Sequence, residues 1–256
     1  MLHYDKYYNN KKEWVVFIHG IGGNNKTWKN QIEEFSKEFN LILIELPAHG
    51  KSKQINYKIN SDTICMAIKE VLDYEKITNA NFVALSLGTI VFSYFVVKYP
   101  EYIKNAILTG AAINMNWFCK MCLAIAYPFL HILPYKLLYN VITFIVAPRK
   151  EYKSARRLFI DEFDTMDRKR IIEWVKFIAL IIKSKQTVYK MKEVNKKILF
   201  ISGGGDFLFI DGARYTAKKL NKNIIILKNR CHVCNLDGYK DFNKYSISFI
   251  KENGLP

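Results

Sequence analysis

The chain has 256 residues, of which 50% are hydrophobic and 24% charged, the balance of a globular protein long enough to bury a full core. That apolar content excludes a disordered chain, and 12 glycines and 6 prolines without a short repeat exclude a collagen-like one. The formal net charge is +16, and residues 113–192 hold more than half of it, with 15 basic and 6 acidic residues.

Apolar strands alternate with helices in the first 112 residues. In chain order, the predicted elements are a strand at 14–19, a helix at 27–38, a strand at 41–46, a helix at 62–74, a strand at 81–85, a helix at 88–98 and a strand at 103–109. Ser61 or Asp62 is the expected N-cap of the helix at 62–74. Continuous apolar strands that alternate with helices indicate a parallel sheet covered on both faces.

The alternation stops at residue 113 and resumes after residue 192. The stretch between them has a helical pattern throughout, first apolar and then basic. The later predicted elements are a strand at 197–202, a helix at 211–220, a strand at 224–228 and a helix at 238–252. We therefore expect an α/β fold with a mostly parallel central sheet, a core formed by 1–112 and 193–256, and an inserted helical cap, or lid, at 113–192.

A serine lies at the junction between the strand at 81–85 and the helix that follows it. Ala84 and Gly88 stand two residues before and after Ser86. A serine at such a strand-to-helix turn projects its hydroxyl above the edge of the sheet, and the turn needs small residues at those two positions. The N-terminus of the next helix favours negative charge at the same point. Ser86 is therefore a candidate nucleophile.

Two further loops follow predicted strands. The first has the sequence HGIGG, formed by His19, Gly20, Ile21, Gly22 and Gly23. The second, at residues 45–52, has the sequence ELPAHGKS. A phosphate-binding turn is the alternative interpretation of the first loop, but the G-x-G-x-x-G fingerprint and the Gly-Lys-Ser/Thr loop are both missing.

These segments resemble motifs of the α/β-hydrolase fold superfamily, in particular its serine hydrolases and esterase-like members with a helical cap. The serine turn is similar to the G-x-S-x-G nucleophile elbow, with Ala84 in place of the first glycine. HGIGG resembles the H-G-x-G-G oxyanion loop, and ELPAHGKS resembles the D-x-P-G-x-G-x-S turn. The resemblance covers 14–112 and 194–252 and leaves out the insert. It implies an oxyanion hole formed by the backbone N–H groups of Ile21 and Leu87, worth ~3 kcal/mol each.

The same resemblance implies two partners for Ser86. Asp206 follows the strand at 197–202, and His232 follows the strand at 224–228, in the order Ser, Asp, His that this fold uses. By resemblance, His232 takes the proton of Ser86 and returns it to the leaving group, while Asp206 holds the imidazole in the required tautomer. Other residues remain open as the acid or the base, namely Asp211, Asp237, His3, His19, His49 and His131.

A serine at the elbow, where related enzymes with other chemistry have aspartate, implies acyl transfer through a covalent acyl-enzyme. We predict a serine hydrolase that cleaves carboxylic esters, with an apolar acyl or aryl group bound beneath the cap. Thioesterase, monoglyceride-lipase-like and carbon–carbon bond hydrolase activities are alternatives on the same triad. A ligand-binding, receptor-like protein with vestigial turnover is the non-enzyme alternative.

The sequence gives no support for a metal or a cofactor. Cys119 and Cys122, like Cys231 and Cys234, have the spacing of zinc ligands, but 108 residues separate the two pairs and the second brackets His232. The N-terminus has no apolar signal region and the cysteine count is odd, so we expect a cytoplasmic protein with reduced thiols. No nucleic-acid motif is present. The basic insert has two interpretations, a composition bias or weak association with an anionic membrane surface.

Overall fold

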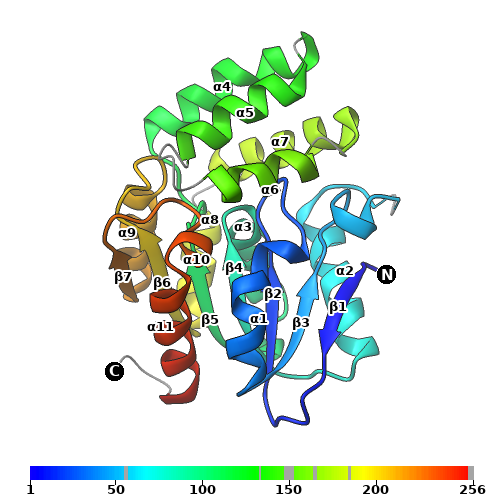
Figure 1. Cartoon of the computed structure of the whole chain (residues 1–256), viewed down its shortest axis with the longest axis vertical. Helices are drawn as coiled ribbons and strands as arrows, with labels where there is room; N and C mark the ends of the chain where they lie inside the picture. Colours follow the sequence, from blue (N-terminus) through cyan, green and yellow to red (C-terminus); the bar gives the residue numbers. More distant parts are fainter. Residues whose placement is uncertain (55–56, 133, 147–152, 164–165, 184–185, 253–256) are drawn as a thin grey trace.

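A computed structural model describes residues 1–54, 57–132, 134–146, 153–163, 166–183 and 186–252 of the chain (Figure 1). Its strands form one seven-stranded sheet in the order β1-β3-β2-β4-β5-β6-β7. The strands are β1 (Tyr4–Tyr7), β2 (Trp14–Ile18), β3 (Asn40–Ile44), β4 (Ala80–Leu85), β5 (Ile103–Thr109), β6 (Lys197–Gly203) and β7 (Asn223–Leu227). All neighbouring strands are parallel except β1, which runs antiparallel to β3. The predicted α/β fold class is confirmed.

The central strands are buried on both faces, as their continuous apolar sequences predict. Every residue of β3 and β4 is buried, and the side chains of Val15, Ile42 and Val83 are fully inaccessible to solvent. Parallel strands of this kind need helices on both sides, since neither face can meet water. Their carboxyl ends all point to one edge of the sheet, where the loops that carry the predicted site residues gather.

Helices cover both faces of the sheet. One layer contains α1 (Lys29–Ser36), α10 (Cys234–Asp237) and α11 (Tyr239–Glu252), which pack on one another (Figure 1). The other layer contains α2 (Ser61–Tyr74), α3 (Leu87–Lys98), α8 (Gln186–Val194) and α9 (Ile210–Leu220). The helix α3 is apolar nearly all round and almost wholly buried, because it lies under the middle of the sheet between α2 and α8.

Four helices of the insert lie beyond the carboxyl edge of the sheet, at the top of Figure 1. They are α4 (Trp117–Ile132), α5 (Tyr135–Val146), α6 (Lys153–Phe163) and α7 (Arg168–Lys183). The fifth helix of the stretch between β5 and β6 is α8, which packs beside α3 and α9 instead. None of the helices in the described residues is long and apolar enough to span a membrane.

Two local features differ from the sequence prediction. The strand β1 was not predicted, because its sequence YDKY contains two charged residues and no apolar run; it pairs only with β3, at the edge of the sheet. The N-cap of α2 is Asn60 and not Ser61 or Asp62, so that prediction was wrong. The Asn60 side chain accepts a hydrogen bond from the Thr63 N–H at 2.9 Å, which satisfies one of the free donors of the first turn.

Candidate active site

The turn between β4 and α3 holds Ser86 in a strained backbone conformation. Its φ of 51° and ψ of −114° lie where a residue with a side chain rarely occurs, at a cost of about 1–3 kcal/mol. Two hydrogen bonds fix the turn: the Ser86 N–H donates to the Thr109 carbonyl at 3.0 Å, and the Thr89 N–H donates to the Ser86 carbonyl at 2.8 Å. A Cβ at Gly88 would lie 2.3 Å from the Ile18 carbonyl oxygen, so the small residue that the sequence pattern required is required here by close backbone packing.

Asp206 and His232 form a buried pair at the ends of neighbouring strands. The Asp206 Oδ2 atom lies 2.7 Å from the His232 Nδ1 atom, and the two residues are 2% and 4% exposed. Backbone bonds bring their loops together, because the Gly204 N–H donates to the Leu227 carbonyl and the Gly205 N–H to the Arg230 carbonyl, both at 2.8 Å. An Nδ1–H that donates to the carboxylate leaves the Nε2 atom of His232 as the free acceptor.

Ser86 and His232 both lie against the end of β5. The Ser86 N–H bonds to Thr109, and the next residue, Gly110, adjoins the imidazole so closely that a Cβ there would lie 2.9 Å from the His232 Cε1 atom. Within the described part of the chain, the Ser86 hydroxyl forms no hydrogen bond with His232. Such catalytic bonds are often long in unliganded enzymes and tighten when substrate binds.

The glycine loop that carries Ile21 lies against the serine. A Cβ at Gly20 would lie 3.2 Å from the Cβ of Ser86. The peptide between Ile21 and Gly22 is held at both ends: its carbonyl accepts from the Tyr139 hydroxyl at 2.9 Å, and its N–H donates to the Nε2 atom of His49 at 3.1 Å. Gly22 has a φ of 66°, and a Cβ there would lie 2.2 Å from the Tyr139 hydroxyl oxygen. The loop therefore depends on glycine, on a helix of the insert and on the second predicted loop.

Two buried histidines support this loop in their neutral form. His19 donates from Nδ1 to the Gly20 carbonyl at 2.7 Å and accepts the Leu46 N–H on Nε2 at 3.0 Å. Burial lowers the pKa of His19 to about 4. Burial, together with the neighbouring His19, lowers the pKa of His49 well below its ordinary value. Each imidazole accepts a backbone N–H on Nε2 and contacts a backbone carbonyl through Nδ1, so neither has a ring nitrogen left to serve as a base.

An apolar cavity of about 370 Å³ opens over Ser86. Its size is within the range of small-molecule sites. Its residues come from the elbow, the glycine loop, the helices α4, α5, α6 and α7, and the segment before α9. They are Ile21, Ser86, Leu87, Ile90, Ala112, Met115, Phe118, Cys119, Cys122, Leu123, Ala126, Leu130, Tyr139, Phe163, Ile171, Val175, Ile178, Phe207, Leu208 and Phe209. None of these is a lysine, arginine, histidine or carboxylate, so the cavity suits an uncharged, apolar group.

Comparison with known proteins agrees with this architecture. The family model described as alpha/beta hydrolase fold matches residues 13–239. The chain belongs to this family. Over 98 residues this α/β hydrolase is 33% identical to the pimeloyl-[acyl-carrier protein] methyl ester esterase of Wigglesworthia glossinidia brevipalpis, covering 38% of this chain and 36% of that protein. Over 100 residues it is 31% identical to the (E)-2-((N-methylformamido)methylene)succinate hydrolase of Acinetobacter baylyi, covering 38% of each chain.

The matched part of this α/β hydrolase thus spans less than two fifths of these curated relatives, both of which are named as hydrolases. Solved structures match almost throughout. MenH from S. aureus has a TM-score of 0.82 at 20% identity, with 98% of this chain and 99% of that chain covered. The enol-lactonase from Burkholderia xenovorans LB400 has a TM-score of 0.82 at 18% identity, with 97% and 96% covered. At these identities the structural match shows the fold.

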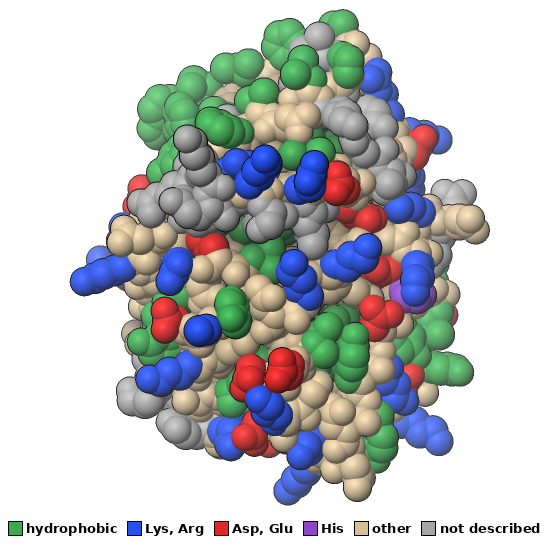
Figure 2. Space-filling view, in the orientation of Figure 1, with side chains coloured by type: hydrophobic (Ala, Val, Ile, Leu, Met, Phe, Trp, Pro, Cys, Tyr) green, Lys and Arg blue, Asp and Glu red, His purple; other side chains and the backbone are tan. Residues whose placement is uncertain are grey.

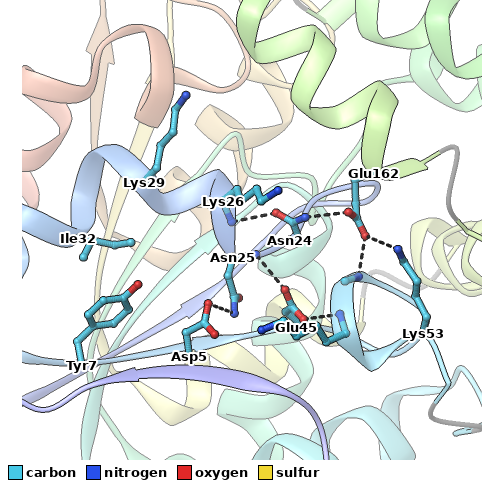
Figure 3. Close-up of a pocket in the computed structure, with 12 residues that line it drawn as sticks. Asp5, Tyr7, Asn24, Asn25, Lys26, Lys29, Ile32, Glu45, Lys53 and Glu162 are labelled. Atoms are coloured by element: carbon cyan, nitrogen blue, oxygen red, sulfur yellow. Dashed lines mark hydrogen bonds and ion pairs between the residues drawn. The ribbon is translucent and has the colours of Figure 1, made fainter.

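The insert of this α/β hydrolase contributes two polar residues that the sequence analysis missed. Besides Tyr139, the carboxylate of Glu162 on α6 accepts the Asn24 side-chain amide at 2.8 Å and the Gly50 N–H at 2.7 Å, and lies 3.5 Å from the Lys53 ammonium. Figure 3 shows this carboxylate at the edge of a polar pocket, where it meets Asn24, just after the first predicted loop, and Lys53, just after the second. No motif marks either residue, since both lie outside the loops whose motifs the sequence analysis recognised.

The alternative site residues lie in other surroundings. Asp211 is exposed on α9 near Arg214, and Asp237 accepts the Cys231 N–H at 2.8 Å, which fixes the loop before α10. His3 lies beside Glu45, and His131 is exposed at the end of α4. Burial raises the pKa of the Cys119 and Cys234 thiols to about 12, so neither is a thiolate at neutral pH. Across the described residues, no group of three or more metal-ligating side chains gathers.

Proposed function

We propose that this α/β hydrolase is a serine hydrolase that cleaves carboxylic esters of apolar acyl or aryl groups. The observation that carries the proposal is the position of Ser86: it lies on a strained elbow at the floor of an apolar cavity, beside the strand end that also adjoins the His232–Asp206 pair. A nucleophile needs a base within reach and a base oriented by a third group; in our proposal His232 is that base and Asp206 is the group that orients it.

In the proposed reaction, the Ser86 Oγ atom attacks the ester carbonyl carbon while its proton passes to the Nε2 atom of His232. Asp206 stabilises the imidazolium through Nδ1–H. The tetrahedral intermediate places its oxyanion at the N–H groups of Ile21 and Leu87. The Leu87 N–H belongs to the first turn of α3 and therefore has no acceptor within that helix. The intermediate collapses, the C–O bond to the alcohol breaks, and His232 protonates the departing alcohol.

Deacylation repeats these steps with water. His232 takes a proton from the water as its oxygen attacks the acyl carbon, and the second intermediate releases the acid as Ser86 regains its proton. We propose that the α4–α7 helices serve as the predicted cap and that their apolar side chains receive the acyl or aryl group. The chemistry needs no metal or cofactor. Cytoplasmic location stays a prediction from the cysteine content.

The lining of the cavity favours substrates with a neutral acyl group over substrates with a carboxylate there. The succinate hydrolase of Acinetobacter baylyi, by its name, acts on a substrate with carboxylate groups. A buried carboxylate needs a cationic or hydrogen-bonding partner, and the described lining of this cavity offers no cation. We therefore place a neutral acyl group there. A thioester of the same acyl group would fit equally well and is the second candidate.

A chain-length series tests this function. Because the cavity has a volume of about 370 Å³, within the range of small-molecule sites, p-nitrophenyl esters with acyl chains of about six to ten carbons should give the highest kcat/KM. Acetate and palmitate esters should be slower, and matched thioesters separate esterase from thioesterase activity. A fluorophosphonate probe should label the wild-type chain and not the Ser86→Ala variant. One product molecule per chain, without turnover, would support the receptor-like alternative and overturn hydrolysis.

A further inference from the structure

The outer surface of the α4–α5 pair is apolar and open to solvent. Large apolar side chains are exposed on α4 at intervals of three or four residues, and the same spacing occurs on α5. They are Trp117, Met121, Ile125, Phe129 and Ile132 on α4, and Leu137, Val141 and Phe144 on α5. We call these eight residues the outer apolar face. Figure 2 shows hydrophobic side chains gathered over this end of the molecule.

The degree of exposure makes this face unlike an ordinary surface. Trp117 is 74% exposed and Ile132 is 76% exposed. Single exposed apolar residues are common on soluble proteins, but a contiguous group of large ones marks a site of contact with another apolar surface. The helices α4 and α5 pack against each other, so their stripes adjoin.

The same helix lines the cavity with a different set of side chains. Phe118, Cys122 and Leu130 of α4 face the cavity, whereas Met121 and Ile125 belong to the outer apolar face. Phe118 takes part in both environments, since it lines the cavity and is 40% exposed, and its ring lies 6.1 Å from that of Trp117. The apolar lining of the cavity therefore continues to the outer apolar face without a polar barrier at this point.

Three basic residues adjoin this face. The sequences of α4 and α5 contain no aspartate or glutamate, and Lys120 is exposed among the apolar side chains of α4. Arg156 of α6 lies 5.5 Å from the centre of the Phe144 ring, and Arg168 of α7 donates to the carbonyl of His131 at 3.3 Å. Apolar residues flanked by cations are complementary to a lipid surface with anionic head groups.

We propose that the outer apolar face docks on an anionic phospholipid surface. The apolar side chains of α4 and α5 enter the head-group region, and the basic side chains beside them meet the phosphates. The sequence charge alone favoured a composition bias over a membrane; the exposed apolar residues beside basic ones favour the membrane. A second copy of the chain is disfavoured as the occupant, because it would bring its own Lys120, Arg156 and Arg168 close to those of the first copy.

Docking would also open a path for an apolar substrate from the membrane into the cavity. Phe118 would lie at the lipid boundary, so an apolar ester dissolved in the membrane could pass to Ser86 without crossing water. This consequence rests on the proposed function, whereas the docking itself does not involve Ser86. Binding is therefore measured with the Ser86→Ala variant, so that loss of hydrolysis and loss of docking are read separately.

The experiment is flotation with vesicles of phosphatidylcholine, with and without phosphatidylglycerol. Ile125→Gln and Val141→Gln should each lower binding to the anionic vesicles about tenfold, because each removes an apolar side chain from the face. Met66→Gln is the matched control: Met66 lies on α2 and is 57% exposed, against 56% for Ile125. Lys120→Gln should lower binding about fivefold at low salt and less at high salt.

Each result decides the proposal. Anionic vesicles should retain the chain more strongly than neutral ones, and Met66→Gln should bind as the unsubstituted chain does. Equal binding of Ile125→Gln and Met66→Gln would overturn the assignment to this face. Equal retention by neutral vesicles would overturn the part played by anionic lipid. If vesicles do not bind and Ile125→Gln turns a dimer into a monomer, a second copy is the occupant and the proposal is wrong.

Discussion

The core and the insert of this α/β hydrolase are held together in different ways. In the core, the site-bearing loops are joined backbone to backbone, as where the Ser86 N–H meets the Thr109 carbonyl and the Gly205 N–H meets the Arg230 carbonyl. The insert meets the core through side chains: Tyr139 on the glycine loop, Glu162 on two loops, and the Trp174 indole N–H on the Pro47 carbonyl at 3.0 Å.

Because the two regions are held differently, substitutions in them should affect the reaction differently. Backbone bonds between buried strands are the last to open, so the core fixes the geometry of the reacting groups. The insert touches that geometry at few points, chiefly the Tyr139 bond to the glycine loop, so a single substitution there should disturb it less. We therefore expect substitutions in the core to abolish the reaction on every substrate, and substitutions in the insert to change rate or selectivity by smaller factors.

The largest effect is expected at Ser86. Ser86→Ala should lower kcat about 10⁴-fold or more on every ester of the series, whatever its acyl chain, since it removes the proposed nucleophile. Ser93→Ala is the matched control, because Ser93 lies on α3, is fully buried and donates only to the Ile90 carbonyl at 2.6 Å. Steady-state rates of the purified variants measure both. Substantial turnover by Ser86→Ala would place the nucleophile elsewhere.

The next effect is expected at Asp206. Asp206→Asn keeps the shape of the residue but favours the wrong tautomer of His232, and should lower kcat by about 10³–10⁴-fold. Asp211→Asn, an exposed residue that the sequence left open as the acid, should change kcat less than twofold. A larger loss in Asp211→Asn than in Asp206→Asn would exchange their roles.

The sequence predicted the parts of the molecule in which local pattern and topology agree. Ser86, Asp206 and His232 follow strands in one parallel sheet, and short loops leave little choice about where such residues lie. The small residue required at Gly88 follows from the turn itself. The amino-acid pattern is sufficient to place these residues, because strand order and loop length determine their positions.

The remaining features depend on packing that no local pattern records. Tyr139 reaches the glycine loop, and Glu162 reaches Asn24 and Gly50, only because α5 and α6 lie across the carboxyl edge of the sheet. The role of His49 as acceptor for the Gly22 N–H depends on two loops meeting, although both were recognised separately. The strand β1 has a sequence with two charges and forms because β3 offers a free edge.

The buried histidines of the core should make its stability depend on pH. The pKa of His19 in the folded chain is about 4, while an unfolded histidine binds a proton below about 6.5. Above about pH 6.5, His19 is neutral in both the folded and the unfolded chain. As the pH falls toward 4, only the unfolded chain binds the proton, which lowers the free energy of unfolding by about 3 kcal/mol for this residue. Urea unfolding at about pH 7, 5.5 and 4.5 measures the loss.

The control for this prediction is the unsubstituted chain. His19→Gln should flatten the pH dependence of its unfolding free energy, because one of the protonations that oppose folding is removed. Equal slopes for His19→Gln and the unsubstituted chain would mean that His19 has no part in setting the acid limit.

The smallest effect is expected where the two regions meet. Tyr139→Phe removes the hydrogen bond to the Ile21 carbonyl and keeps the ring, which stacks on Phe163 at a centroid distance of 3.6 Å. Loss of one such bond, at about 1–1.5 kcal/mol, should lower kcat roughly tenfold. The carbonyl belongs to the peptide next to the Ile21 N–H, so the loss should fall on kcat and be equal for short and long esters.

Leu130→Phe is the informative contrast, because it narrows the cavity and leaves the glycine loop untouched: it should slow long esters more than short ones. If Tyr139→Phe changed chain-length preference in the same way and left kcat on acetate esters intact, the tyrosine would act on the acyl group alone. The insert would then have no part in holding the glycine loop.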